Sequence, residues 1–237
     1  MMYIFKVAGC LPPKGEQMEN LKISELYDLT HTDAAPLLAR FVYPFEALSS
    51  IKDFIISLFP TLDSNEYYNP EEGVYIHKTA IVAKTASINA PCIIGEGTEV
   101  RHCAFIRGSA LVGKNCVVGN STELKNVILF DNVQVPHYNY VGDSILGYRS
   151  HMGAGSITSN VKSDKTLVTV NAEQKIPTGL KKFGAMLGDY VEVGCNSVLN
   201  PGTIIGRNSN IYPLSSVRGV IPANSIYKKQ GEIAAKR

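Results

Sequence analysis

The feature that most constrains this chain is a six-residue period of branched aliphatic side chains. Counted in steps of six, the first series is unbroken: Ile76, Val82, Ile88, Ile94, Val100, Ile106, Val112, Val118 and Leu124. The frame returns in a second series: Leu187, Val193, Leu199, Ile205, Ile211 and Val217. Strands of a β-sandwich alternate with period two and their turns vary in spacing, so a fixed period of six argues against a sandwich.

Small residues and glycines hold other fixed places in the repeat. A small residue stands two positions before the aliphatic: Ala80, Ala86, Cys92, Thr98, Ala104, Ala110, Cys116 and Thr122. Glycine follows the aliphatic at Gly95, Gly113, Gly119, Gly188, Gly194 and Gly206. A coil of three short strands, about 18 residues in all, explains both observations. The aliphatic fills the axis, and the small residue leaves room near a corner. We therefore expect an all-β fold, a left-handed parallel β-helix of hexapeptide repeats from about Tyr75 to Val217.

The parts of the chain outside the repeat suggest three regions. We expect a partly helical segment over 1–70, the β-helix over 71–221 and a tail over 222–237. Apolar residues in the first region lie on one helical face that ends at Pro60: Leu48, Ile51, Ile55 and Leu58. We expect this region to cap the open end of the solenoid. The tail is expected to form a turn followed by a short polar helix or a disordered end.

The six-residue frame is lost between Thr158 and Leu187. We expect a protruding loop near 161–186, since long insertions in a rigid coil lie outside it and often carry binding residues. Lysines concentrate there: Lys162, Lys165, Lys175, Lys181 and Lys182. For any one of these lysines, a solvated side chain is an equally good interpretation.

Composition and charge exclude several classes of protein. A net charge of +2 gives no reason to expect a nucleic-acid or membrane partner. No apolar run approaches the roughly 20 residues of a membrane span, and residues 1–16 lack signal-peptide architecture. The five cysteines form no C-x-x-C pair, so we expect free thiols in a cytoplasmic protein, with Cys92 and Cys116 serving as packing residues.

Two cations are expected to stack on one outer face of the coil. Arg107 and Lys125 each follow an axial aliphatic, and those aliphatics are one whole coil apart. Like charges one strand spacing apart repel unless an anion lies between them, so the pair suggests a phosphate site. Two side chains splayed into water are the alternative interpretation.

The next coil is shorter by one residue, which changes what lies above this pair. Val141 then stacks on Leu124, and Gly142 lies above Lys125, where we expect open space. Tyr140 lies above Glu123 in the same register. His137 stands close by in VPHYNYVGD, on or near a turn. A lone histidine is more often structural, but here a cation pair, a carboxylate and a glycine converge near it.

These residues carry a resemblance to a known family. The stretches VGNSTELKNVIL, VPHYNYVGDSILG and HMGAGSITSN resemble the acetyltransferase domain of the bacterial bifunctional N-acetylglucosamine-1-phosphate uridyltransferase, over about Phe105 to Asn160. They also resemble stand-alone proteins labelled as pyrophosphorylase-related. The resemblance implies a homotrimer that transfers acetyl from acetyl-CoA to the amine of an amino-sugar phosphate such as glucosamine 1-phosphate. It implies no covalent enzyme intermediate and no metal.

The resemblance also implies a role for individual residues. His137 falls at the general base and Glu123 at the carboxylate that orients it. The positions implied to bind the acceptor are Arg107, Lys125, Tyr140, Asn160 and His151. The positions implied to bind the coenzyme are Ala154, Cys195, Pro213 and Lys228, with Lys229 or Gln230 as alternatives to Lys228. Histidine suits the role because an amine must lose a proton when it attacks a thioester.

Some departures keep other interpretations open. His151 stands where the family has Asn, and Val161 where it has Tyr, which motivates a non-catalytic trimeric scaffold or sugar-nucleotide-binding module as the alternative function. Residues 1–70 lack the Gly-rich loop of the uridyltransferase half, so we expect no nucleotidyltransferase activity. A zinc hydratase on the same coil needs three converging histidines, and the spacing of the histidines in this sequence does not suggest such a site.

Overall fold

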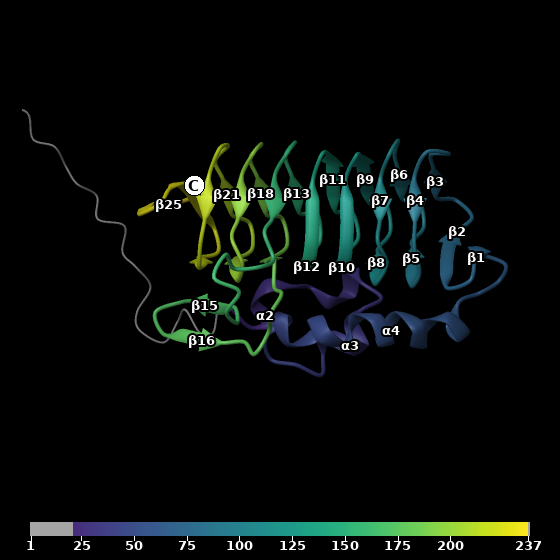
Figure 1. Ribbon diagram of the computed structural model, residues 1–237, viewed down its shortest axis with the longest axis horizontal. Helices are drawn as coiled ribbons and strands as arrows, with labels where there is room; N and C mark the ends of the chain where they lie inside the picture. The colour runs from purple at the N-terminus through teal and green to yellow at the C-terminus, as the bar shows by residue number, and fades with distance from the viewer. Residues whose placement is uncertain (1–20, 237) are drawn as a thin grey trace, which may run out of the picture.

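The computed structural model describes residues 21–236, which form a parallel β-helix with a helical segment along one side (Figure 1). The expected fold class is confirmed. Residues 1–16, which lack signal-peptide architecture, lie outside the described residues, and so does Cys10. No helix in the described part of the chain has the length and apolar character needed to cross a membrane.

Parallel pairing sorts the strands of the β-helix into three faces. The first face consists of β2 (Val74–His77), β5 (Cys92–Ile94), β8 (Ala110–Val112), the second halves of β10 (Glu123–Leu129) and β12 (Tyr140–Leu146), β17 (Ala185–Leu187), β20 (Thr203–Ile205) and β23 (Val220–Ile221). The second face consists of β3 (Ile81–Val82), β6 (Glu99–Val100), β9 (Val117–Asn120), β11 (Gln134–His137), β13 (His151–Met152), β18 (Glu192–Val193), β21 (Asn210–Ile211) and β24 (Ser225–Lys229). The third face consists of β4 (Ser87–Ile88), β7 (Phe105–Ile106), the first halves of β10 and β12, β14 (Ile157–Thr158), β19 (Val198–Leu199) and β22 (Ser216–Val217).

The aliphatics of the six-residue series fill the axis, as the sequence predicts. From Val100 to Leu124 each member of the series is at most 1% exposed. Leu124 pairs with Val141, so the coil does shorten by one residue at the expected place. Cys92 and Cys116 are buried, in agreement with a packing role. Burial raises the pKa of the Cys116 thiol to about 12.

The first face is covered by the helical segment. Its outward residues form a buried apolar column: Ile93, Leu111, Ile128, Ile145, Met186 and Ile204. The covering elements are α2 (Ile23–Leu26), η1 (Leu29–His31), α3 (Ala35–Leu38), η2 (Pro44–Ser50), α4 (Ile51–Leu58) and η3 (Phe59–Thr61). Ile51 and Ile55 are fully buried, as their helical spacing predicts.

The helical segment does not close the end of the solenoid, so in its described part the expected end cap is wrong. Its elements lie side by side along the axis (Figure 1). The Tyr27 hydroxyl donates to the carbonyl of Ile145 (3.3 Å), and the Asn126 amide donates to the carbonyl of Leu48 (3.1 Å). Burying an apolar face of several coils stabilises the protein more than closing one end does, because it removes more apolar surface from water.

Asp189 connects the helical segment to the coil through hydrogen bonds. Its carboxylate is fully buried and accepts hydrogen bonds from the backbone N–H groups of Asp28 and Tyr148, both at 2.8 Å. The guanidinium of Arg207 donates to it at 2.8 Å. Burial nevertheless raises the pKa of Asp189, since removal from water disfavours the charged form.

The insertion between the two aliphatic series folds back on the molecule. It contains an antiparallel ribbon of β15 (Thr169–Asn171) and β16 (Lys175–Pro177), beside the later coils (Figure 1). Val168, Val170 and Phe183 are fully buried, and the Phe183 ring stacks on Phe45 at 5.5 Å. The insertion therefore continues the layer that the helical segment begins.

Both ends of the described β-helix carry an antiparallel hairpin. At the first coil β1 (Tyr67–Glu71) pairs with β2, and at the last coil β25 (Glu232–Ala235) pairs with β24. The expected polar helix or disordered tail is therefore wrong for the part up to residue 236. The reason is that β24 continues the ladder of the second face, and Gly231, with φ +78°, reverses the chain.

Candidate active site

Two columns of stacked residues border the third face. The histidine column runs along the corner between the second and third faces: His102, Asn120, His137, Ala154, Cys195 and Pro213. The cation column runs along the corner between the third and first faces: Arg107, Lys125, Gly142, Ser159, Asn200 and Arg218. Between them the third face presents an outward row: Phe105, Glu123, Tyr140, Ile157, Val198 and Ser216.

Backbone hydrogen bonds fix the order of the histidine column. The N–H of Gly155 donates to the carbonyl of His137 at 3.0 Å. In the next coils the N–H of Asn196 donates to Ala154 (2.8 Å) and the N–H of Leu214 to Cys195 (2.9 Å). Each step along a β-ladder is about 4.8 Å. The coil therefore aligns the implied base with three of the four implied coenzyme positions.

A groove of about 510 Å³ follows this column through the later coils. Its lining includes Gly153, Cys195, Tyr212, Pro213 and Ile226. The floor is close-packed, since a Cβ on Gly194 would lie 2.4 Å from the nitrogen of Pro213. The groove gives an extended ligand room along the coil.

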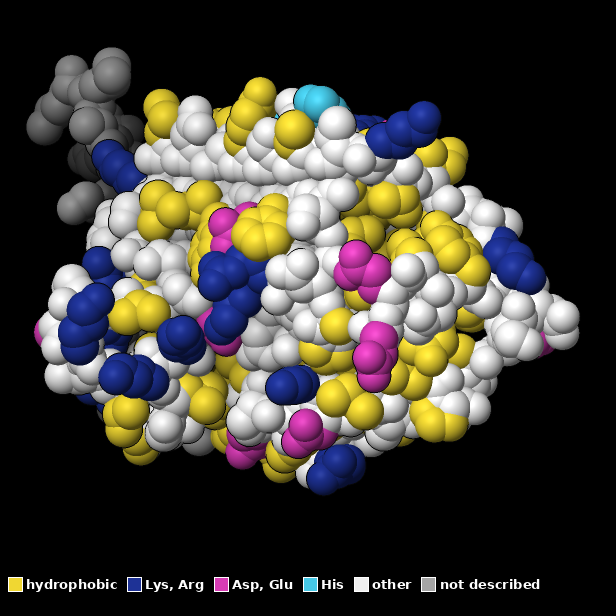
Figure 2. Space-filling view, turned by 45° about the vertical axis from the view of Figure 1, so that its right-hand side comes forward, with side chains coloured by type: hydrophobic (Ala, Val, Ile, Leu, Met, Phe, Trp, Pro, Cys, Tyr) yellow, Lys and Arg dark blue, Asp and Glu magenta, His cyan; other side chains and the backbone are white. Residues whose placement is uncertain are grey.

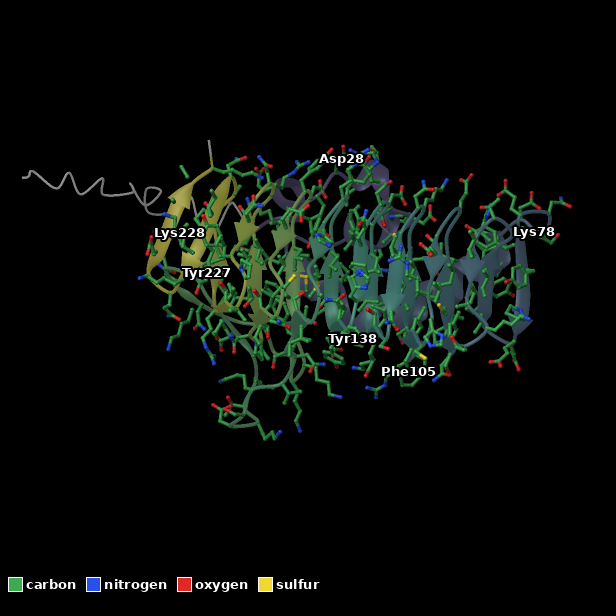
Figure 3. All side chains as sticks on the ribbon, turned by 90° about the horizontal axis from the view of Figure 1, so that it is seen from above. Asp28, Lys78, Phe105, Tyr138, Tyr227 and Lys228 are labelled. Atoms are coloured by element: carbon green, nitrogen blue, oxygen red, sulfur yellow. The ribbon has the colours of Figure 1, made fainter. Side chains whose placement is uncertain are left out.

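Lys228, the fourth implied coenzyme residue, lies at the far end of the described coils. It sits beside Tyr227 on β24, well away from Tyr138 (Figure 3). Its Nζ forms an exposed ion pair with Glu232 at 3.4 Å. An exposed pair of this kind is worth little, so Lys228 can exchange Glu232 for another anion.

The cation column does not hold two unpaired charges, which corrects the sequence-based picture. Arg107 donates to the carboxylate of Glu123 at 2.7 Å, and this hydrogen bond is the main reason that the pKa of Arg107 is raised. Lys125 contacts both carboxylate oxygens of Asp143, at 3.0 and 3.1 Å. Stacked cations repel, and in this chain a carboxylate beside each of them relieves the repulsion.

Asp143 belongs to the site but was not among the residues predicted from the sequence. Only 4% of it is exposed, and its carboxylate also accepts from the amides of Asn126 (3.0 Å) and Asn160 (2.5 Å). Its φ of +48° is one that Asp adopts more readily than most residues. The signal was an Asp directly after Gly142 at a corner, where a short polar side chain can reach the stacked Lys125.

Tyr140 fills the space that Gly142 was expected to leave open, so that expectation is wrong. A Cβ on Gly142 would lie 2.4 Å from the Tyr140 hydroxyl. The same hydroxyl accepts from the Asn160 amide at 3.2 Å. Burial, together with the nearby charges of Asp143 and Glu123, raises the pKa of Tyr140. Arg107, Lys125, Tyr140 and Asn160 thus belong to one polar cluster with the two carboxylates.

His137 is exposed at the corner beside this cluster. Among residues 21–236 its imidazole has no hydrogen-bond partner, and the carboxylate of Glu123 is bound to Arg107 instead. Tyr138, the next residue, and Phe105 point outward from the same long side of the coil, opposite Asp28 (Figure 3). This side of the coil is therefore open around the candidate base.

His151 is not brought to the cluster within one chain. It lies on the second face, where its Nδ1 lies 2.8 Å from a carboxylate oxygen of Glu192. A second groove, of about 480 Å³, is lined there by His151, Glu192, Gln134 and Arg149 among others. Within the described chain, His151 therefore does not lie with the other residues implied to bind the acceptor.

Comparison with known proteins supports the family suggested by the motifs. The family model described as the GMPPB C-terminal domain matches residues 92–205. The "Bifunctional protein GlmU" of Methanococcus maripaludis is 37% identical over 114 residues, which is 48% of this chain and 28% of that protein. These matches confirm the resemblance.

A second relative has a similar two-part name. The "Bifunctional sugar-1-phosphate nucleotidylyltransferase/acetyltransferase" of Sulfurisphaera tokodaii is 33% identical over 105 residues, or 44% of this chain and 26% of that protein. The chain spans less than a third of the length of the curated relatives it matches. Among solved structures, the N-acyltransferase AntD from Bacillus cereus aligns with 73% of this chain and 91% of its own, at 18% identity and a TM-score of 0.39.

Proposed function

We propose that this chain is an acetyl-CoA-dependent N-acetyltransferase that acts on an amino-sugar phosphate such as glucosamine 1-phosphate. The observation that carries the proposal is the alignment of His137 with Ala154, Cys195 and Pro213 in one column, beside the cluster of Arg107, Glu123, Lys125, Tyr140 and Asn160. The names of the relatives matched over this segment point to the same chemistry.

His137 serves as the general base in this proposal. Its imidazole accepts the proton that the acceptor amine loses as the nitrogen attacks the thioester carbonyl. The carbon–sulfur bond then breaks, and the sulfur leaves as a thiol after taking up a proton. Backbone N–H groups of the corner turns stabilise the oxyanion, and no covalent enzyme intermediate forms. The exposed, unpaired ring of His137 is free to make this contact.

The polar cluster binds the acceptor. Arg107 and Lys125 hold the sugar phosphate, and Tyr140 and Asn160 contact the sugar. Phosphate is a charge-assisted partner for both cations, so it competes with Glu123 for Arg107, which is exposed enough to reorient. Once released, the Glu123 carboxylate can orient His137. Phosphate binding thereby allows Glu123 to orient the general base, His137.

The coenzyme lies in the groove along the histidine column. Ala154 is small enough for the thioester to approach closely, and Cys195 and Pro213 line the path toward Lys228. We propose a homotrimer, in which the second face of a neighbouring chain brings His151 to the acceptor. The exposed side chains of Phe105 and Tyr138, 38% and 62% accessible, lie at the edge where such a neighbour would pack.

The test is thiol release from acetyl-CoA with glucosamine 1-phosphate as acceptor. The His137→Ala variant should lose roughly 10²- to 10⁴-fold in rate, the usual contribution of a general base. His102→Ala is the matched control, because His102 stands two coils earlier in the same column and bonds Thr85 through Nδ1 (2.6 Å). Equal rates in the wild type and His137→Ala, with measurable turnover, would remove His137 from the mechanism.

A non-catalytic scaffold or sugar-nucleotide-binding module remains the second candidate. The pairing of Arg107 with Glu123 and of Lys125 with Asp143 favours it, because both implied phosphate ligands are already neutralised. Thiol release absent across a panel of amino sugars, together with ligand binding that His137→Ala leaves intact, would support this candidate.

A further inference from the structure

The insertion over 161–186 and the later coils enclose a further polar cavity, the loop cavity, of about 410 Å³. It is lined by Ser159, Val161, Lys162, Ser163, Asp164, Thr169, Asn171, Lys175, Asn200, Pro201 and Arg218. The size lies within the range of small-molecule sites. Figure 2 shows basic side chains gathered at the lower left, the region where Figure 1 draws the β15–β16 ribbon.

The wall of the loop cavity is held rigidly by close backbone packing. A Cβ on Gly219 would lie 2.5 Å from the carbonyl oxygen of Asn171, and one on Gly202 would lie 2.9 Å from the Val168 side chain. Both glycines have positive φ, +79° and +80°. Only glycine lets the coil approach β15 so closely. The cavity is therefore formed by close packing of the insertion against the coils, and its cations do not lie on a freely protruding loop.

The charges of the lining do not balance. Among residues 21–236, three cations and one carboxylate line the cavity, and Asp164 is already shared with Lys162 at 3.3 Å. Within residues 21–236, neither the side chain of Lys175 nor that of Arg218 makes a hydrogen bond or ion pair. This contrasts with Arg107 and Lys125, each of which has its own carboxylate. The unneutralised charge of the cation column therefore lies at its Arg218 end.

The remaining lining supplies hydrogen-bonding groups suited to an oxyanion. Ser159, Ser163 and Thr169 carry hydroxyls, and Asn171 carries an amide. A guanidinium, an ammonium and several neutral donors around one cavity are the usual ligands of a phosphate group. Two unpaired cations match the double negative charge of a phosphate monoester.

The loop cavity is distinct from the acceptor cluster. Arg218 stands four steps along the column from Lys125, roughly 19 Å at the usual strand spacing. A single phosphate cannot contact both residues. We propose that the loop cavity is a second anion site, which binds a phosphate-bearing small molecule through Arg218 and Lys175. The site goes beyond the proposed acetyl transfer and does not depend on it.

The experiment is calorimetric titration of the full chain with inorganic phosphate and with pyrophosphate, in the absence of acetyl-CoA. The substitutions Arg218→Gln and Lys175→Gln should each weaken binding about tenfold, the effect of losing one charge-assisted hydrogen bond. Both residues are exposed and unpaired, so the variants should fold. Tighter binding of pyrophosphate than of phosphate would indicate a diphosphate ligand, and the reverse a monoester.

The double variant Lys165→Gln/Lys182→Gln is the matched control. It removes two charges from the same insertion, but neither lysine lines the cavity. The control should bind as the wild type does. Equally weakened binding in the control would show that binding depends only on the overall positive charge of the insertion, and would overturn the proposed site. Absence of binding for both probes, or a loss confined to Lys125→Gln, would overturn it as well, whatever the acetyl-transfer assay gives.

Discussion

The carboxylate of Asp143 is the most informative group to remove from the polar cluster. Asp143→Asn keeps the shape of the side chain and tolerates the φ of +48°, so it changes charge with little backbone strain. The oxygen of the new amide can still accept two hydrogen bonds. Its NH₂ group, however, faces two of the present donors, which are the ammonium of Lys125 and the amide of either Asn126 or Asn160.

The expected cost follows from the burial of the two partners. Breaking a buried ion pair by removing one partner costs about 3–5 kcal/mol, because the other charge stays buried and unpaired. The Lys125 side chain is 25% exposed and can reach water, so the cost should be smaller, about 2–3 kcal/mol. For a chain of this size that corresponds to a fall in Tm of roughly 4–12 °C.

Thermal unfolding followed by circular dichroism measures the shift, with Glu96→Gln as control. Glu96 pairs with Lys114 at 3.7 Å, and both side chains are about half exposed, so its loss should change Tm by less than about 2 °C. A double-mutant cycle with Lys125→Met isolates the pair itself. A Tm for Asp143→Asn within the scatter of the wild type, or no coupling in the cycle, would show that the carboxylate does not hold Lys125.

Three further predictions concern other parts of the fold. Burial raises the pKa of Asp189 above 3.8, so the folded protein holds this proton to higher pH than the unfolded chain does. The resulting contribution to stability is present below pH 3.8 and is lost as the pH rises through the folded pKa. In urea unfolding, Asp189→Asn should flatten that decline in stability. Alkylation mapped by mass spectrometry should modify the exposed thiols Cys103 and Cys195 in the native protein, but Cys92 and Cys116 only after unfolding; native labelling of Cys116 would contradict its burial. Gly119→Ala should prevent folding or destabilise the coil strongly, since its Cβ would lie 1.6 Å from the carbonyl oxygen of Pro136. Gly231→Ala should cost only the strain of a positive φ, about 1–2 kcal/mol. Equal soluble yields and Tm values for the two variants would refute this difference.

The sequence by itself determined the coil and its register. Each axial aliphatic and each small corner residue repeats locally, so the position of one coil fixes the next without knowledge of the remaining fold. This is why the pairing of Leu124 with Val141, and of Glu123 with Tyr140, could be predicted from spacing alone. The stacking of Arg107 and Lys125 in one column followed from the same reasoning.

The covered face was also encoded in the sequence, though not in the six-residue series. Strands of the first face have three apolar residues in succession, as in Cys92–Ile94 and Ala185–Leu187, so their outward side chains need cover too. The six-residue series records only the inward positions, and the helical segment was therefore expected at the end of the solenoid.

Only the tertiary structure decided which charges neutralise each other and where the non-repeating parts lie. The contacts of Asp28 with Asp189, of Leu48 with Asn126 and of Phe45 with Phe183 join residues far apart in the chain. A periodic pattern has no information on such contacts, because they depend on the surface that the assembled coils present together. The same holds for the loop cavity, whose two unpaired cations come from the insertion and from a coil more than forty residues later.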